Sequence, residues 1–204
     1  MGVEPTVRDG LDRDETAALT ALAARIRELT EAAVLTGAGA GEAAAVADEL
    51  AALTARLSAV RRAAPPFTGT GESGIDRQIA NPVAGTINPI APPVDIEVTP
   101  DGIARAEFTL SQVYEGPPAY VHGGVSAMVL DQVLGMAAAA TGNHGMTATL
   151  ELRYRRPTPL GVPLLVEAKA SRTEGRKIYA DGAITGPDGR VTVEATALFV
   201  MPRR

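Results

Sequence analysis

The sequence of 204 residues contains no cysteine and only two histidines. Disulfide bonds, thiolate metal sites and a cysteine nucleophile are therefore excluded, and a histidine-rich metal centre is not expected. Aromatic residues make up only 3% of the chain, whereas 46% of the residues are apolar. The chain can therefore bury a proper core, which must be packed mainly from small aliphatic side chains.

The sequence also has no basic tract and no long apolar run. Its net charge is −5, which argues against nucleic acid as the main partner. The N-terminus lacks the cationic stretch and apolar core of a signal peptide, and no segment approaches the roughly 20 apolar residues of a membrane span. We therefore expect a cytoplasmic protein without a membrane partner.

Residues 1–63 have the pattern of a helical hairpin. Apolar residues recur at spacings of three and four, which predicts one apolar stripe on each of two helices, over residues 11–36 and 42–62. The stripes consist of Leu19, Leu22, Ile26 and Leu29, and of Val46, Leu50, Leu53, Leu57 and Val60. Glycines between the two segments favour an antiparallel turn. The hairpin is either a packing or oligomerisation element, or a partner-binding or lid element.

Residues 64–93 form a different kind of segment, with many prolines and glycines. Such a composition predicts an extended connector, but apolar residues such as Ile79, Val83 and Ile87 make it too hydrophobic for a free linker. We expect it to lie against the following domain and to cover part of its site.

Residues 94–204 are predicted to form an α+β domain. Alternation marks strands at 94–98 and 103–110, and four further runs follow at 146–155, 163–173, 177–185 and 191–201. One long apolar segment, residues 121–141, lies between the second and third strands and contains a single ionisable side chain, Asp131. This order predicts a curved antiparallel sheet of about six strands wrapped around a central helix.

The central segment carries a motif that continues into the next strand. It comprises His122-Gly123-Gly124, then Asp131 nine residues after the histidine, then Met146-Thr147-Ala148 and the run Tyr154-Arg155-Arg156-Pro157-Thr158-Pro159-Leu160. With its flanking blocks, from about residue 88 to 201, this order resembles the hotdog-fold thioesterases. It is most similar to the branch with phenylacetate-pathway and carboxyl-terminal-modulator-type acyl-CoA thioesterases.

The resemblance implies hydrolysis of an acyl thioester, usually a coenzyme A ester, without a metal or a bound redox cofactor. By position, Gly123 and Gly124 supply the backbone N–H that holds the thioester oxygen, Asp131 is the general base or nucleophile, and Thr147 positions Asp131 or water. For His122, an orienting or capping role is favoured over direct acid–base chemistry.

The residues agree with these roles. Glycines at a helix start let a substrate oxygen approach unpaired N–H groups at the positive end of the dipole. Asp131 lies among apolar neighbours, so we expect it to be desolvated and a better base. Gly123 and Asp131 are about 12 Å apart along a helix, too far to contact one carbonyl. We therefore expect a homodimer with two composite sites, as in the hotdog family, which could pair further into a homotetramer.

Two placements stay open. Regular alternation puts Ala148 and Leu150 on the core face and Thr147 on the other, so the strand either starts irregularly or directs Thr147 to the dimer seam; Thr149 is the reserve candidate. The densest group of cations is Arg153, Arg155, Arg156, Arg176 and Lys177. It is either a solvated strand edge or a contact with the coenzyme A phosphates.

Two other functions fit parts of the pattern. A hotdog dehydratase or hydratase also places a histidine before a helix and a carboxylate on it. The Gly-Gly pair after His122 and the absence of a proline-rich helix start argue against that reaction. The other alternative is a non-catalytic acyl-CoA-binding or scaffold protein whose hairpin signals to a partner.

Overall fold

The computed structural model describes residues 10–66 and 78–203. Parts of the predicted hairpin and connector, residues 1–9 and 67–77, therefore lie outside the described residues. The described chain divides into two compact units. The first contains residues 10–66, 78–80 and 86–89, and the second contains residues 81–85 and 90–203.

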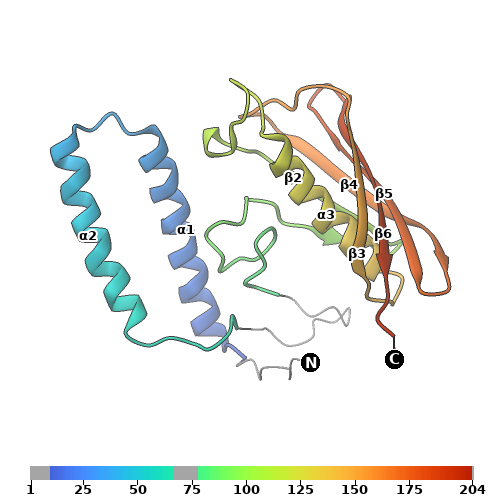
Figure 1. The fold of residues 1–204 in the computed structure, drawn as a ribbon, viewed down its shortest axis with the longest axis horizontal. Coiled ribbons are helices and arrows are strands. Elements are labelled where there is room, and N and C mark those ends of the chain that lie inside the picture. The colour runs from blue at the N-terminus through green and yellow to red at the C-terminus, as the bar shows by residue number, and fades with distance from the viewer. Residues whose placement is uncertain (1–9, 67–77, 204) are drawn as a thin grey trace. The chain divides into compact units, whose positions relative to one another are not determined.

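The first unit contains the two predicted helices, α1 (Arg13–Leu35) and α2 (Ala40–Ser58). They run in opposite directions and are joined by residues 36–39 (Figure 1). A capping box starts α1, because Asp12 accepts from the N–H of Glu15 at 2.8 Å and Glu15 accepts from the N–H of Asp12 at 3.2 Å. Arg27 donates to the carbonyl of Asn88 at 3.0 Å. This bond ties α1 to the returning segment 86–89.

The second unit is an antiparallel sheet with one long helix against it (Figure 1). Its strands are β1 (Glu97–Val98), β2 (Ile103–Phe108), β3 (Met146–Tyr154), β4 (Leu164–Glu174), β5 (Lys177–Thr185) and β6 (Val191–Val200). They lie in the order β1-β2-β4-β5-β6-β3, so β3 is an edge strand. The predicted α+β architecture of six strands around a central helix is confirmed.

The first strand was predicted over residues 94–98, but only Glu97 and Val98 pair as β1. Val94 and Ile96 are buried in the core without ladder partners. Their alternation therefore reflects burial of side chains from an irregular segment, because the same period arises whenever every second residue faces a core.

The central helix α3 (Gly123–Ala139) packs along the inner face of the sheet. Val129, Leu130, Val133 and Leu134 are fully buried, and each contributes about 1.5–3 kcal/mol through the removal of its side chain from water. The opposite side of the helix, which includes Asp131, is only half-buried in the single chain. A helix that is apolar on every side is normally buried on every side. The half-buried side of α3 therefore presents apolar surface that a partner could cover.

Part of the connector covers α3. Val83 is buried in the same core as the helix. Asn81 donates to the side-chain oxygen of Gln132, which follows Asp131, at 3.0 Å. The side-chain Oδ1 of Asn81 accepts from the backbone N–H groups of Val83 and Ala84 at 2.7 and 3.0 Å, which holds the turn. Residues 81–85 of the predicted connector therefore pack against α3, at Gln132, whereas residues 78–80 and 86–89 group with the first unit.

Candidate active site

His122 is the N-cap of α3. Its Nδ1 atom accepts a hydrogen bond from the N–H of Gly124 at 3.0 Å, and its own N–H donates to the carbonyl of Tyr114 at 2.9 Å. The imidazole thus satisfies one of the four N–H groups that a helix start leaves unpaired. This geometry is that of a capping residue, and it removes the N–H of Gly124 from those free to bind a ligand.

The N–H of Gly123 is different. Among the residues that the structure describes, it has no acceptor, as expected for the first residue of a helix. The carbonyl of Gly123 accepts from the hydroxyl of Tyr154 at 2.9 Å. The peptide joining Gly123 to Gly124 is therefore held at its oxygen by Tyr154 and at its nitrogen by His122. The free N–H of Gly123 belongs to the preceding peptide, whose carbonyl, that of His122, accepts from the N–H groups of Val125 and Ser126 at 2.9 and 3.3 Å.

Sequence reasoning did not find Tyr154. It comes from the C-terminal end of β3, 31 residues after Gly123, and the sequence pattern assigned it no role beyond its place at the start of the Tyr-Arg-Arg-Pro run. A Cβ atom on Gly123 would lie 3.2–3.3 Å from the Tyr154 ring, tighter than ordinary packing. A side chain at residue 123 would therefore need the Tyr154 ring to shift by a few tenths of an ångström. A tyrosine before the Arg-Arg-Pro run was the available signal.

The loop before α3 is held in a strained conformation. Ala119 has φ of 68°, a left-handed value that costs an L-residue about 1–2 kcal/mol. The carboxylate of Glu115 accepts from the N–H of Ala119 at 2.6 Å, and the N–H of Val121 donates to Thr158 at 2.9 Å. Gly116 packs so closely on His122 that a Cβ there would be 2.7 Å from its Cα. These contacts fix the entry of the chain into the helix.

Asp131 and Thr147 are in direct contact. The Thr147 hydroxyl donates to Oδ1 of Asp131 at 3.0 Å. Thr147 is paired with Phe199 and Thr149 with Leu198, so Ala148 is an unpaired bulge residue. Because Phe199 is buried on the inner face, Thr147 faces α3 and Thr149 faces outward. Of the two explanations offered for Thr147, the irregular strand start is therefore correct. Thr149, the alternative residue, points away from Asp131.

Gly123 and Asp131 lie on one unbroken helix, about 12 Å apart along its axis. The single chain therefore presents two half-sites, the free N–H at one end of α3 and the Asp131–Thr147 pair near its middle. Among the described residues, no three side chains of His, Cys, Asp or Glu are grouped to hold a metal ion.

The predicted basic cluster is split by the sheet. Lys177 pairs with Val200, which pairs with Met146, whereas Arg155 and Arg156 follow the other end of β3. The two groups are separated by the length of that strand, about 26 Å. The prediction that these cations form a single cluster is therefore wrong within one chain. The hairpins between the strands place residues that are close in sequence at opposite ends of the sheet.

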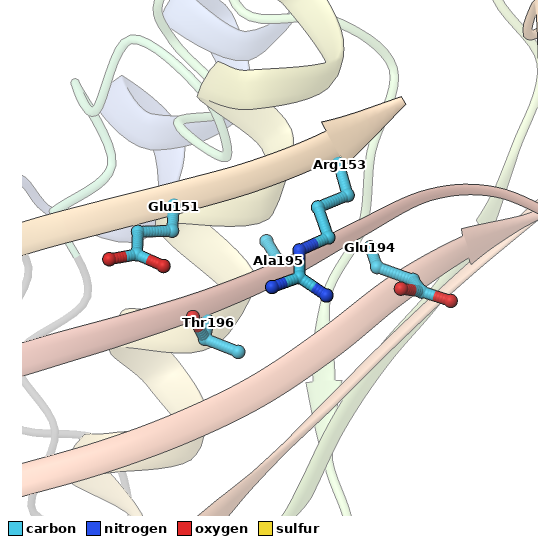
Figure 2. A pocket seen from close by; sticks show the side chains of 5 residues that line it. All are labelled: Glu151, Arg153, Glu194, Ala195 and Thr196. Carbon is cyan, nitrogen blue, oxygen red and sulfur yellow. The ribbon is translucent and has the colours of Figure 1, made fainter. Parts of the chain in front are cut away.

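Two of the predicted cations, Arg155 and Arg176, have side-chain hydrogen bonds within the chain. Arg155 donates to Glu194 at 2.8 and 3.0 Å, an exposed pair worth at most about 1 kcal/mol. Arg176 donates to the carbonyl of Met201 at 2.9 Å. Arg153 lies over a shallow depression of about 130 Å³ on the outer face, which Glu151, Glu194, Ala195 and Thr196 also line (Figure 2).

Comparison with known proteins places this chain in a family. The thioesterase superfamily model matches residues 119–193, which include His122, Asp131 and Thr147. A crystal structure of a thioesterase superfamily protein is 38% identical, with a TM-score of 0.81 over 95% of this chain and 97% of that chain. The chain belongs to the thioesterase superfamily. Because the match covers nearly the whole chain, this superfamily member shares its N-terminal helices with the solved protein.

Curated relatives match the central part of the chain. Acyl-coenzyme A thioesterase THEM4 of Xenopus laevis is 38% identical over 87 residues, which are 42% of this chain and 39% of that protein. The mouse protein of the same name is 37% identical over 87 residues, 42% of this chain and 37% of that protein. The chain thus spans less than two-fifths of these curated relatives.

A Streptococcus mutans protein, solved bound to acetyl-CoA, shares the fold with a TM-score of 0.51 and 18% identity, over 54% of this chain and 90% of that chain. The hotdog fold that the motif implied is therefore confirmed for this thioesterase superfamily member. In the described part of the chain, no helix is long and apolar enough to span a bilayer.

Proposed function

We propose that this thioesterase superfamily member hydrolyses acyl-CoA thioesters to the free acid and coenzyme A. The observation that carries the proposal is the pair of half-sites on α3, the unpaired N–H of Gly123 and the Asp131 carboxylate with its Thr147 donor. The match to curated proteins named acyl-coenzyme A thioesterases supports it, and the acetyl-CoA complex provides a precedent on the same fold. Coenzyme A is then part of the substrate, and no further cofactor is required.

In this reaction the thioester carbonyl oxygen accepts from the N–H of Gly123, where the helix start stabilises the developing negative charge. Asp131, held by the Thr147 hydroxyl, takes a proton from water, whose oxygen adds to the carbonyl carbon. The tetrahedral intermediate then expels the thiolate, which takes up a proton. The C–S bond breaks and a C–O bond forms, giving acid and thiol; attack by Asp131 itself through an anhydride is the other route.

The two half-sites require a second subunit. A two-fold axis near Ala127, midway between Gly123 and Asp131, would set the N–H of one subunit opposite the carboxylate of the other. The edge strand β3 is suited to this pairing, since Met146 and Tyr154 at its ends are 76% and 56% exposed and edge strands have unpaired backbone groups. We propose a homodimer whose interface is formed by β3 and α3. Further assembly would involve the N-terminal hairpin of α1 and α2.

Within one chain, the coenzyme A phosphates would contact only one of the two groups of cations. Arg155 and Arg156 lie beyond one end of β3, and Arg176 and Lys177 lie at the other. In each composite site the nucleotide would leave toward one of these ends, where arginine donors suit phosphate.

The first experiment is thiol release from a panel of short, long and aromatic acyl-CoAs. The chain has no cysteine, so the enzyme adds no thiol background. Asp131→Asn is expected to abolish turnover while folding and acyl-CoA binding persist, and Asp181→Asn, on the outer face of β5, is the matched control. Binding without thiol release by the wild type would favour the non-catalytic alternative, and hydrolysis by Asp131→Asn would refute the assignment.

The composite site is tested by mixing two inactive chains. Gly123→Pro removes the proposed donor at the first helical position, which accepts proline, and Asp131→Asn removes the base. A mixed dimer has one intact site if donor and base come from different subunits, so random mixing restores about a quarter of wild-type activity. If both groups act within one subunit, the mixture stays inactive.

A further inference from the structure

Helix α2 has an apolar stripe that stays largely exposed among the described residues of its unit. None of its 19 residues is buried, and Val46, Leu53 and Leu57 are 37%, 48% and 57% exposed. In contrast, α1 buries Ala23 and is bonded to segment 86–89 through Arg27. A helix whose stripe stays in water gains little from folding, because packing of the apolar face supplies most helical stability.

The spacing of the stripe indicates what covers it. Within α2, Val46, Leu50, Leu53 and Leu57 follow each other at four, three and four residues. These spacings match the a and d positions of a two-stranded coiled coil, whose seam is narrower than the stripe of a helix lying on a globular core. The side of the helix opposite the seam contains small residues such as Ala55.

The charges beside the seam fix the direction of the partner helix. Glu49 and Arg56 flank the same side of the stripe, seven residues apart. A parallel copy in register would set Glu49 level with Glu49 and Arg56 level with Arg56, and lateral ion pairs would be lost. An antiparallel copy sets Glu49 beside Arg56 of the second copy, twice by symmetry, and this pairing selects the orientation.

We propose that α2 pairs antiparallel with α2 of a second copy of this chain, through the seam that runs from Val46 to Leu57. In the register that joins Glu49 to Arg56, Leu50 packs opposite Leu53 and Val46 opposite Leu57. The pairing adds a second self-interface, separate from the proposed β3 and α3 dimer. It does not depend on the proposed thioesterase activity.

The absence of cysteine makes the register testable by disulfide formation. Chains with the single substitution Val46→Cys or Leu57→Cys are expressed alone and together, then oxidised. In the antiparallel pair, residue 46 of one chain lies opposite residue 57 of the second chain. Two thiols at the same position, both at 46 or both at 57, are about 16 Å apart along the helix axis and cannot form a disulfide. Co-expression should therefore yield several-fold more linked chains than either variant alone.

The matched control co-expresses Val46→Cys with Ala55→Cys, which has nearly the same axial position as Leu57 but lies on the opposite face of the helix. Linked chains there should stay at the level of the single variants. Strong linking within each single variant would show a parallel pair and overturn the proposal. Linking no greater than in the control would also overturn it, since α1 of the same chain or a different protein would then cover the seam.

Discussion

Removal of the Tyr154 hydroxyl tests the reasoning about the helix start. This hydroxyl donates to the carbonyl of Gly123 at 2.9 Å and, together with His122, holds the peptide next to the free N–H. Tyr154→Phe deletes one oxygen atom and leaves the ring that packs on Gly123 in place. The perturbation therefore loosens the proposed oxyanion donor without opening a cavity.

The expected magnitude follows from the strength of one neutral hydrogen bond. Its net contribution is about 1 kcal/mol, and if that stabilisation is realised in the transition state, kcat falls about fivefold. The Michaelis constant should change little, because the oxygen acquires full charge only after water has added. The free energy of unfolding should fall by no more than about 1 kcal/mol, since Tyr154 is more than half exposed.

The measurement is steady-state thiol release with the preferred acyl-CoA, alongside urea unfolding. Tyr179→Phe is the control, because it removes the same hydroxyl from a tyrosine on the outer face of the sheet. There the Cζ atom of Arg172 lies 3.9 Å from the centroid of the Tyr179 ring. An unchanged kcat in Tyr154→Phe, or an equal fall in Tyr179→Phe, would refute the role assigned to this hydrogen bond.

Two further changes test the strand and the sheet. Thr147→Val should lower kcat about tenfold, because a hydrogen bond to a charged group is worth about 1.5 kcal/mol or more. Thr149→Val on the outer face should not, and an equal loss in both would reject the bulge argument. Gly182→Ala should destabilise the fold by about 1–3 kcal/mol in urea unfolding, because its Cβ would lie 2.8 Å from the carbonyl of Glu167. Gly37→Ala, with nothing within 4 Å, is its control; equal unfolding midpoints would contradict it.

Some features of the site were readable because they are local. The Gly-Gly pair marked the helix start, and His122 was favoured as a capping or orienting residue from its position alone. Helix α2 was predicted over 42–62 and spans Ala40–Ser58, since apolar spacing identifies a helix better than it locates its ends. The fold class followed from the order of strand-like and helix-like hydrophobic patterns along the chain, together with the motif.

Other features depended on strand pairing, which local patterns do not encode. The bulge at Ala148 turns Thr147 toward Asp131, and only the register with β6 reveals it. The β4–β5 hairpin carries Arg176 and Lys177 to the far end of β3 from Arg155, although sequence proximity had suggested one patch.

By itself the sequence determined the central helix, its glycine start, its lone carboxylate and the six-stranded α+β layout, because periodicity and backbone preference act over a few residues. Only the tertiary structure decided that Tyr154 holds Gly123 and that Thr147 holds Asp131. Those contacts join residues 31 and 16 positions apart, and they form only when β3 takes one register against β6 at the edge of the sheet.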